Sequence, residues 1–236
     1  MPPVPTPPKK ENLFLNLICN IAIPTVVLMK FSKDEWLGPI CGLVVALSFP
    51  VAYGLYDLAV RRKTNFFSVL GFVSVLLSGG LGLLKLDAMW FAVKEAAMPL
   101  AIGAVVLLST KSKRPMVREL LFNEQIVDVK RVNAALEEKG RRPDFERLLR
   151  NASLWLALAF VFIALLNFVL ARIVLKSPPS TPAFNEELGR MQLLSWPVIT
   201  IPGMAAIITV FWRLISKLSV VTGLSADEIF HAEKKP

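Results

Sequence analysis

Six candidate residues stand out among the polar and charged residues within apolar blocks of this sequence, where such groups can bind ions or polar substrates. They are Asn16, Asn20, Asp57, Lys94, Glu95 and Asn167. A charged side chain at the centre of a membrane-spanning helix costs roughly 2.5–3.5 kcal/mol on insertion scales, so each one needs either a partner or a function. The chemistry open to these residues is the transport of a proton, a cation or a polar substrate.

The charged residues each have two interpretations. Asp57 lies near the end of its block with Arg61 four residues later on the same face, which fits an ion pair among lipid headgroups or a proton or cation site. Lys94 and Glu95 are adjacent, and adjacent helical positions point in different directions, so we expect no direct pair between them. They form either an amphipathic segment at the outer membrane surface, with Lys94 snorkelling, or a transport site beside the kink that Pro99 introduces.

The asparagines give a weaker signal. Asn16 and Asn20 are four residues apart and share a helix face, and Asn167 lies in the middle of a later block. Their amides favour hydrogen bonds between membrane helices, worth about 1 kcal/mol each. A substrate site would use the same residue type.

The elements that position these residues are long apolar segments. The chain has 236 residues, of which 54% are hydrophobic and only 19% charged, and its mean hydropathy is +0.56. Six blocks cover residues 13–29, 36–60, 66–84, 88–109, 152–175 and 191–215. Crossing the hydrocarbon layer takes about 20 apolar residues, and a helix satisfies its own backbone there. The sequence therefore predicts an all-α integral membrane protein, a polytopic bundle of about six transmembrane helices.

This prediction divides the chain into five regions. Residues 13–110 hold four transmembrane helices and residues 151–216 hold two. A disordered proline-rich tail (1–12) precedes them, a basic loop (111–150) separates them, and a polar tail (217–236) follows.

The basic loop is expected to contain an amphipathic helix over residues 116–138, ended by Lys139-Gly140. A second helix is expected to start at Pro143-Asp144 and to run into the next span. The amphipathic helix either lies on the inner leaflet, in contact with anionic lipid, or packs under the bundle as a connector.

Basic residues are distributed unequally between the two sides of this arrangement. The net charge is +9, and twenty Lys and Arg residues fall on the side of the two tails and the loop, against six on the other side. Positive charge collects on the cytoplasmic side, so we expect both termini to be cytoplasmic and we expect no nucleic-acid binding. The tryptophans agree, because all of them fall near a predicted span end: Trp36, Trp90, Trp155, Trp196 and Trp212.

Motifs for catalysis, metals and cofactors are missing from the sequence. It has no phosphate-binding loop, no HExxH and no GxSxG. Cys19 and Cys41 lie in apolar blocks without a nearby histidine, and His231 is the single histidine. The sequence therefore predicts no catalytic, metal or cofactor site, and a protein that is not an enzyme.

Three local patterns resemble a known family. They are residues 78–87 (SGGLGLLKLD) followed by Lys94 and Pro99; residues 147–151 leading into Trp155 and residues 166–171 (LNFVLA); and the start of the last span after Phe184-Asn185. Over about residues 66–215 the chain resembles the bacterial intracellular septation protein A family and related uncharacterised inner-membrane proteins. It departs from that family in its proline-rich tail and in the charged loop.

The resemblance implies an integral protein of the bacterial inner membrane, concerned with cell-envelope upkeep and septation, and carries over no catalytic residue. We therefore expect a non-enzymatic scaffold or accessory subunit that contacts the lipid bilayer and other membrane proteins, or forms a homo-oligomer. The alternative is a small transporter or channel whose path is lined by the intramembrane polar residues.

Overall fold

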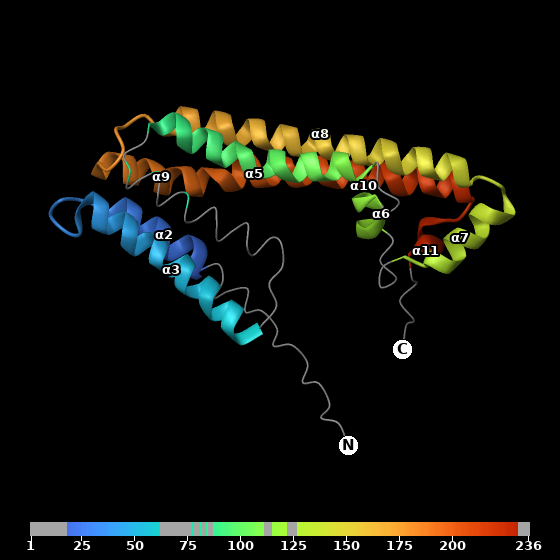
Figure 1. The fold of residues 1–236 in the computed structure, drawn as a ribbon, viewed down its shortest axis with the longest axis horizontal. Helices are drawn as coiled ribbons and strands as arrows, with labels where there is room; N and C mark the ends of the chain where they lie inside the picture. The colour runs from blue at the N-terminus through green and yellow to red at the C-terminus, as the bar shows by residue number, and fades with distance from the viewer. Residues whose placement is uncertain are drawn as a thin grey trace, which may run out of the picture. The chain divides into compact units, whose positions relative to one another are not determined.

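The computed structural model describes residues 18–61, 87–110, 115–121 and 127–230, together with 77, 81 and 84. Over these residues the chain is helical and forms no strand, and an isolated antiparallel bridge joins Val127 to Phe230 (Figure 1). The predicted all-α class is confirmed.

The helices differ greatly in length. The first changes from π to α and back to π over Ile18–Ala22 (η1), Ile23–Val26 (α2) and Val27–Phe31 (η2). The long helices are α3 (Gly38–Arg61), α5 (Ala88–Ser109), α8 (Arg142–Val174) and the continuous run of α9 (Pro182–Ser195), η3 (Trp196–Thr200) and α10 (Ile201–Thr222). The short ones are α6 (Met116–Leu121), α7 (Val129–Glu138) and α11 (Ala226–Ile229).

Four helices in the described part of the chain are long and apolar enough to cross a membrane: Gly38–Tyr56, Ala88–Ser109, Arg142–Val174 and Pro182–Thr222. They overlap four of the six predicted blocks, and α5 has the predicted bounds. The last helix is longer than its predicted block, 191–215, at both ends. The first block is helical over Ile18–Phe31, which at 1.5 Å per residue reaches only about 21 Å. The third block, 66–84, lies almost entirely outside the described residues.

Proline shapes the last long helix. Pro197 lies in η3 and Pro202 follows it, and proline donates no backbone hydrogen bond, so the helix widens locally to π geometry. The helix still runs unbroken for 41 residues, about 60 Å, until Gly223 ends it with φ of 72°. Since the hydrocarbon layer is about 30 Å thick, part of this helix must extend beyond it.

Two compact units make up the chain, one of residues 1–96 and 166–198 and the other of residues 97–165 and 199–236. In the first unit, α9 packs against η2, α2 and α3. Gly189 permits this approach, because a Cβ at that position would lie 3.2 Å from the Thr25 carbonyl oxygen and would collide with Met29.

The second unit is built around a hydrophobic core that α7, α8, α10 and α11 share. Its members include Leu136, Phe145, Leu149, Leu218 and Ile229, all of them buried. The helices α7 and α11 therefore fold against α8 and α10 into one cap, which includes the Val127–Phe230 bridge.

The single helix predicted over residues 116–138 is wrong. Here α6 ends at Leu121 and α7 begins at Val129, after Asp128, whose side chain accepts a hydrogen bond from the Arg131 N–H at 3.0 Å. An aspartate that caps a new helix stops the preceding segment from continuing as one helix, and the bridge to Phe230 holds Val127 extended.

The apolar face of α7 is covered by protein, because Val132 and Leu136 are buried in the core of the second unit. Of the two predicted placements, the structure shows the packed connector. Contact of the loop's basic residues with anionic lipid stays a prediction. The expected stop is confirmed by Gly140 with φ of 62°, and α8 runs from the loop into the span as expected.

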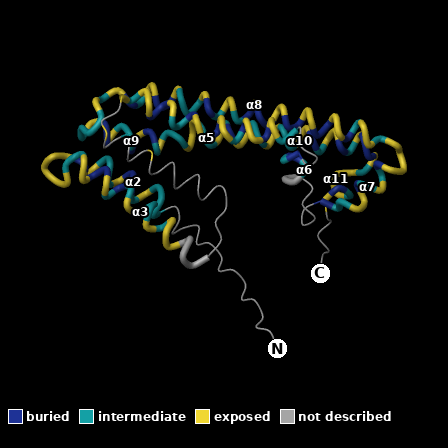
Figure 2. Tube along the Cα trace, in the orientation of Figure 1, coloured by how far each residue is buried: buried dark blue, intermediate teal, exposed yellow. Residues whose placement is uncertain are grey.

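Large apolar residues remain exposed along the long helices. Figure 2 shows the exposed positions of these helices in yellow. In α8 they recur every three or four residues, on one face: Leu154, Leu158, Phe162, Leu165, Val169 and Ile173. A soluble monomer rarely exposes such a stripe. Lipid or neighbouring helices would cover it in a membrane.

Candidate functional site

Lys94 and Glu95 form an ion pair on α5. The Lys94 Nζ lies 2.6 Å from the Glu95 Oε1, and the two side chains are 9% and 27% exposed. The expectation that adjacent positions would not pair is therefore wrong. Their Cβ atoms do point in different directions, but both stems are long and flexible enough to fold back toward each other.

The face of α5 that carries Lys94 is packed against α9. Phe91 lies one turn earlier and makes an edge-to-face contact with Phe184 of α9, with ring centroids 5.0 Å apart. Both phenylalanines are buried. Lys94 is 9% exposed and has a further interaction within the chain. Its placement in an amphipathic segment at the outer membrane surface stays a prediction.

The other candidates that the structure describes lie on separate helices. Asn20 in η1 and Asn167 in α8 are half-buried, and each interacts with another group of the chain. Asp57 lies in α3, but its side chain and the expected pair with Arg61 are outside the described part, as is all of Asn16. Of the six candidates, the structure brings Lys94 and Glu95 into a pair.

Asn185 and Thr25 are buried polar residues that sequence reasoning missed as candidates. The Asn185 Nδ2 donates to the Pro39 carbonyl at 2.6 Å and so ties α9 to the start of α3. The Asn185 Oδ1 and the Thr25 Oγ1 have no hydrogen-bond partner among the described residues. A donor from a water molecule or a ligand would satisfy them. Nothing in the local sequence signals this, because Asn185 sits in a polar stretch typical of a turn.

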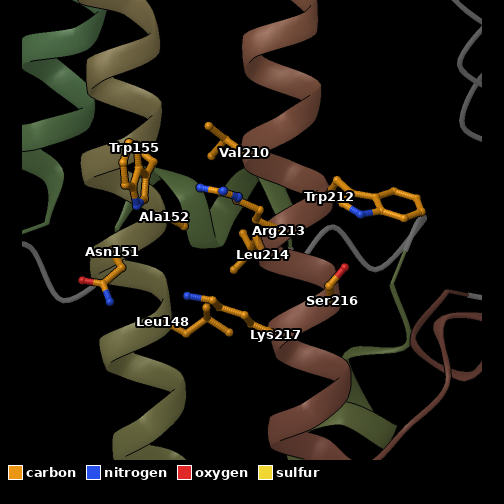
Figure 3. A pocket seen from close by; sticks show the side chains of 10 residues that line it. All are labelled: Leu148, Asn151, Ala152, Trp155, Val210, Trp212, Arg213, Leu214, Ser216 and Lys217. Carbon is orange, nitrogen blue, oxygen red and sulfur yellow. The ribbon is translucent and has the colours of Figure 1, made fainter.

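An open pocket of about 570 Å³ lies between α8 and α10 in the second unit (Figure 3). It is lined by Leu148, Asn151, Ala152 and Trp155 of α8 and by Val210, Trp212, Arg213, Leu214, Ser216 and Lys217 of α10. Figure 3 shows the charged ends of Arg213 and Lys217 extending from α10 toward α8. The lining contains two cations and no carboxylate.

The guanidinium of Arg213 lies over the Trp155 ring, with its central carbon 5.9 Å from the ring centroid. This contact orients the cation within the pocket. Sequence reasoning counted Arg213 and Lys217 only toward membrane orientation. Arg213 directly follows Trp212, and Lys217 comes four residues after Arg213. This spacing could have indicated that the two cations share one helix face.

Polar contacts close the cap of the second unit. The Lys139 Nζ donates to the Thr222 carbonyl at 2.6 Å, and Arg131 forms an ion pair with Glu228. Hydrogen bonds from the Ser225 backbone N–H and hydroxyl, followed by the charge of Arg131, hold the pKa of Glu228 below its ordinary value.

Comparison with protein families, with curated proteins and with solved structures gives no match to this chain.

Proposed function

We propose that this protein is a non-enzymatic, multi-pass protein of the bacterial inner membrane that acts as a scaffold or accessory subunit in cell-envelope upkeep or septation. The proposal includes about six transmembrane helices, with Ile18–Phe31 and residues 66–84 supplying the two beyond the four long ones. Its partners are the lipid bilayer and other membrane proteins, or a second copy of the chain.

The observation that carries the scaffold role is the Lys94–Glu95 pair. Here an acid and a base of the same helix pair at 2.6 Å, and this pairing lowers the cost of holding two charges within an apolar helix. The pocket between α8 and α10 contains neither residue. Both facts favour a structural role for the pair.

The cap of the second unit supports the proposed topology. The Val127–Phe230 bridge joins a residue that precedes α8 to one that follows α10. Residues in contact outside the membrane lie on the same side, which requires an even number of crossings between them. Together with the excess of basic residues on the side of the loop and tails, this supports the proposal that the cap and both termini face the cytoplasm.

Gentle extraction of the full chain from its native membrane, followed by native mass measurement, tests the function. We expect stoichiometric membrane-protein partners or a second copy, and we expect Lys94→Ala to reduce the assembled fraction while the exposed control Glu186→Gln leaves it unchanged. A bare monomer whose assembly state does not respond to Lys94→Ala would refute the scaffold role. A reporter fused after residue 110 tests the orientation, and a periplasmic readout there would overturn it.

A small transporter or channel is the second candidate, and the unpartnered Asn185 Oδ1 and Thr25 Oγ1 favour it. It predicts that Asn185→Leu leaves the protein folded but abolishes solute flux into liposomes. Unchanged flux in that variant would argue against this candidate.

A further inference from the structure

The pocket between α8 and α10 lies where both helices change from polar to apolar. In α8 the charged residues of the first turns end at Arg150, and the run from Ala152 to Ala171 contains no charged residue before Arg172. In α10 the apolar run ends at Trp212, and Arg213 and Lys217 follow. Because both changes occur at the pocket, it lies at one level of the two helices, and that level is the membrane surface if they span it.

Aromatic exposure indicates the same level. Trp155 is 53% exposed and Trp212 is 72% exposed. Indole rings concentrate at the headgroup layer, where the ring lies in an apolar region and the N–H remains wet. The two tryptophans therefore place the pocket among headgroups.

The charges of the pocket select the class of ligand. Arg213 and Lys217 extend into it, and neither forms an ion pair with a carboxylate in the described part of the chain. A guanidinium and an ammonium together bind a phosphate oxygen group well, and Asn151 adds an amide donor to the lining. The volume of about 570 Å³ falls within the range of small-molecule sites, about 300–1,000 Å³.

We propose that this pocket binds the phosphate of an anionic phospholipid, whose acyl chains run along the exposed apolar face of α8. Leu154 lies between the lining residues Ala152 and Trp155 along α8, and Leu158 lies one turn after it, so one lipid can meet both the cations and the apolar stripe. This inference rests on the proposed membrane location and adds a lipid site to it.

The experiment is a lipid titration of the purified full chain in detergent, followed by native mass measurement. The probes are phosphatidylglycerol, phosphatidylcholine and inorganic phosphate. The test variant is Arg213→Gln/Lys217→Gln, and the matched control is Lys130→Gln/Arg147→Gln, which removes the same charge from exposed positions that do not line the pocket. A third variant, Arg213→Lys/Lys217→Arg, keeps both charges.

We expect the wild-type chain to prefer phosphatidylglycerol over phosphatidylcholine. The test variant should bind phosphatidylglycerol about 10- to 30-fold more weakly, because the removal of one cation near anionic lipid lowers the affinity roughly fivefold. The control should change less than about threefold, and the charge-keeping variant should retain most of the affinity. If the test variant fails to fold, Lys217→Gln alone carries the test, with about a fivefold loss expected.

Three results would overturn the proposal. Equal losses in the test and control variants would mean attraction by overall charge, and equal affinity for the two lipids would mean no anionic site. Binding of inorganic phosphate as tight as that of the lipid would assign the pocket to free phosphate. Carbonate extraction of cell membranes tests the membrane location separately. A chain that carbonate releases would be peripheral or soluble and would refute the membrane location itself, whereas a chain that stays in the membrane leaves the lipid site as the question under test.

Discussion

The ion pair on α5 allows a test of whether Lys94 and Glu95 stabilise the fold or serve transport. The changes are Lys94→Met, Glu95→Gln and the two combined, all close in size to the original side chains. Glu95→Gln leaves an ammonium that is 9% exposed without its carboxylate, whereas Lys94→Met leaves a carboxylate that is 27% exposed.

Breaking a buried pair from one side costs about 3–5 kcal/mol. The Glu95 side chain is still 27% exposed, so solvent weakens the pair and we expect a smaller loss of unfolding free energy. The expected losses are about 2–3 kcal/mol for Glu95→Gln and about 1–2 kcal/mol for Lys94→Met. The double variant carries no unpaired charge and should lose only about 1 kcal/mol. The two single losses should therefore exceed the double loss by about 2–4 kcal/mol.

The assay is reversible unfolding in mixed detergent micelles, followed by circular dichroism of the helical signal. Glu186→Gln, an exposed change on α9, controls for loss of a surface carboxylate. Single losses that sum to the double loss within about 0.5 kcal/mol would refute the reasoning, because the two side chains would then act independently.

The second unit gives three further predictions. Leu136→Ala should lower its unfolding free energy by about 2–5 kcal/mol by leaving a cavity in the core, as measured by denaturant titration. Gly223→Ala should lower the melting temperature through a loss of about 1–2 kcal/mol, since φ is 72° and the new Cβ displaces Lys139 from its hydrogen bond; an unchanged melting temperature would contradict this. The fold lowers the pKa of Glu228, so its carboxylate stabilises the cap at pH values above the ordinary glutamate pKa of about 4.3. This stabilisation is lost as the pH falls through the pKa of Glu228 in the folded protein. Melting curves of wild type and Glu228→Gln should therefore converge on acidification, and a constant difference down to pH ~3 would show that the Ser225 contacts are absent.

Sequence patterns were sufficient for the class and for the long helices. The bounds of α5 follow from an apolar run that starts after Asp87, whose carboxylate accepts from the Met89 N–H at 2.7 Å. The continuation of the loop into α8 follows from Pro143-Asp144, a helix-start signal. These features are local, so a local pattern can predict them.

Contacts between distant segments were not predictable in the same way. The break between α6 and α7 depends on Phe230, which lies about a hundred residues further along the chain. The ion pair of Lys94 with Glu95 depends on how the long side chains fold, which helical spacing alone does not determine. The pocket depends on Trp155 of α8 and Arg213 of α10 being neighbours in the fold. The periodicity of the sequence does not predict that α8 lies beside α10.

The closure of the cap has a consequence for how the chain is made. Arg131 and its partner Glu228 are 97 residues apart, so the ribosome completes the loop well before the helix that covers it. At 5–20 residues per second, the apolar face of α7 waits roughly 5–20 s for α11. During that interval Val132 and Leu136 are a transient hydrophobic surface, open to chaperones or to the bilayer.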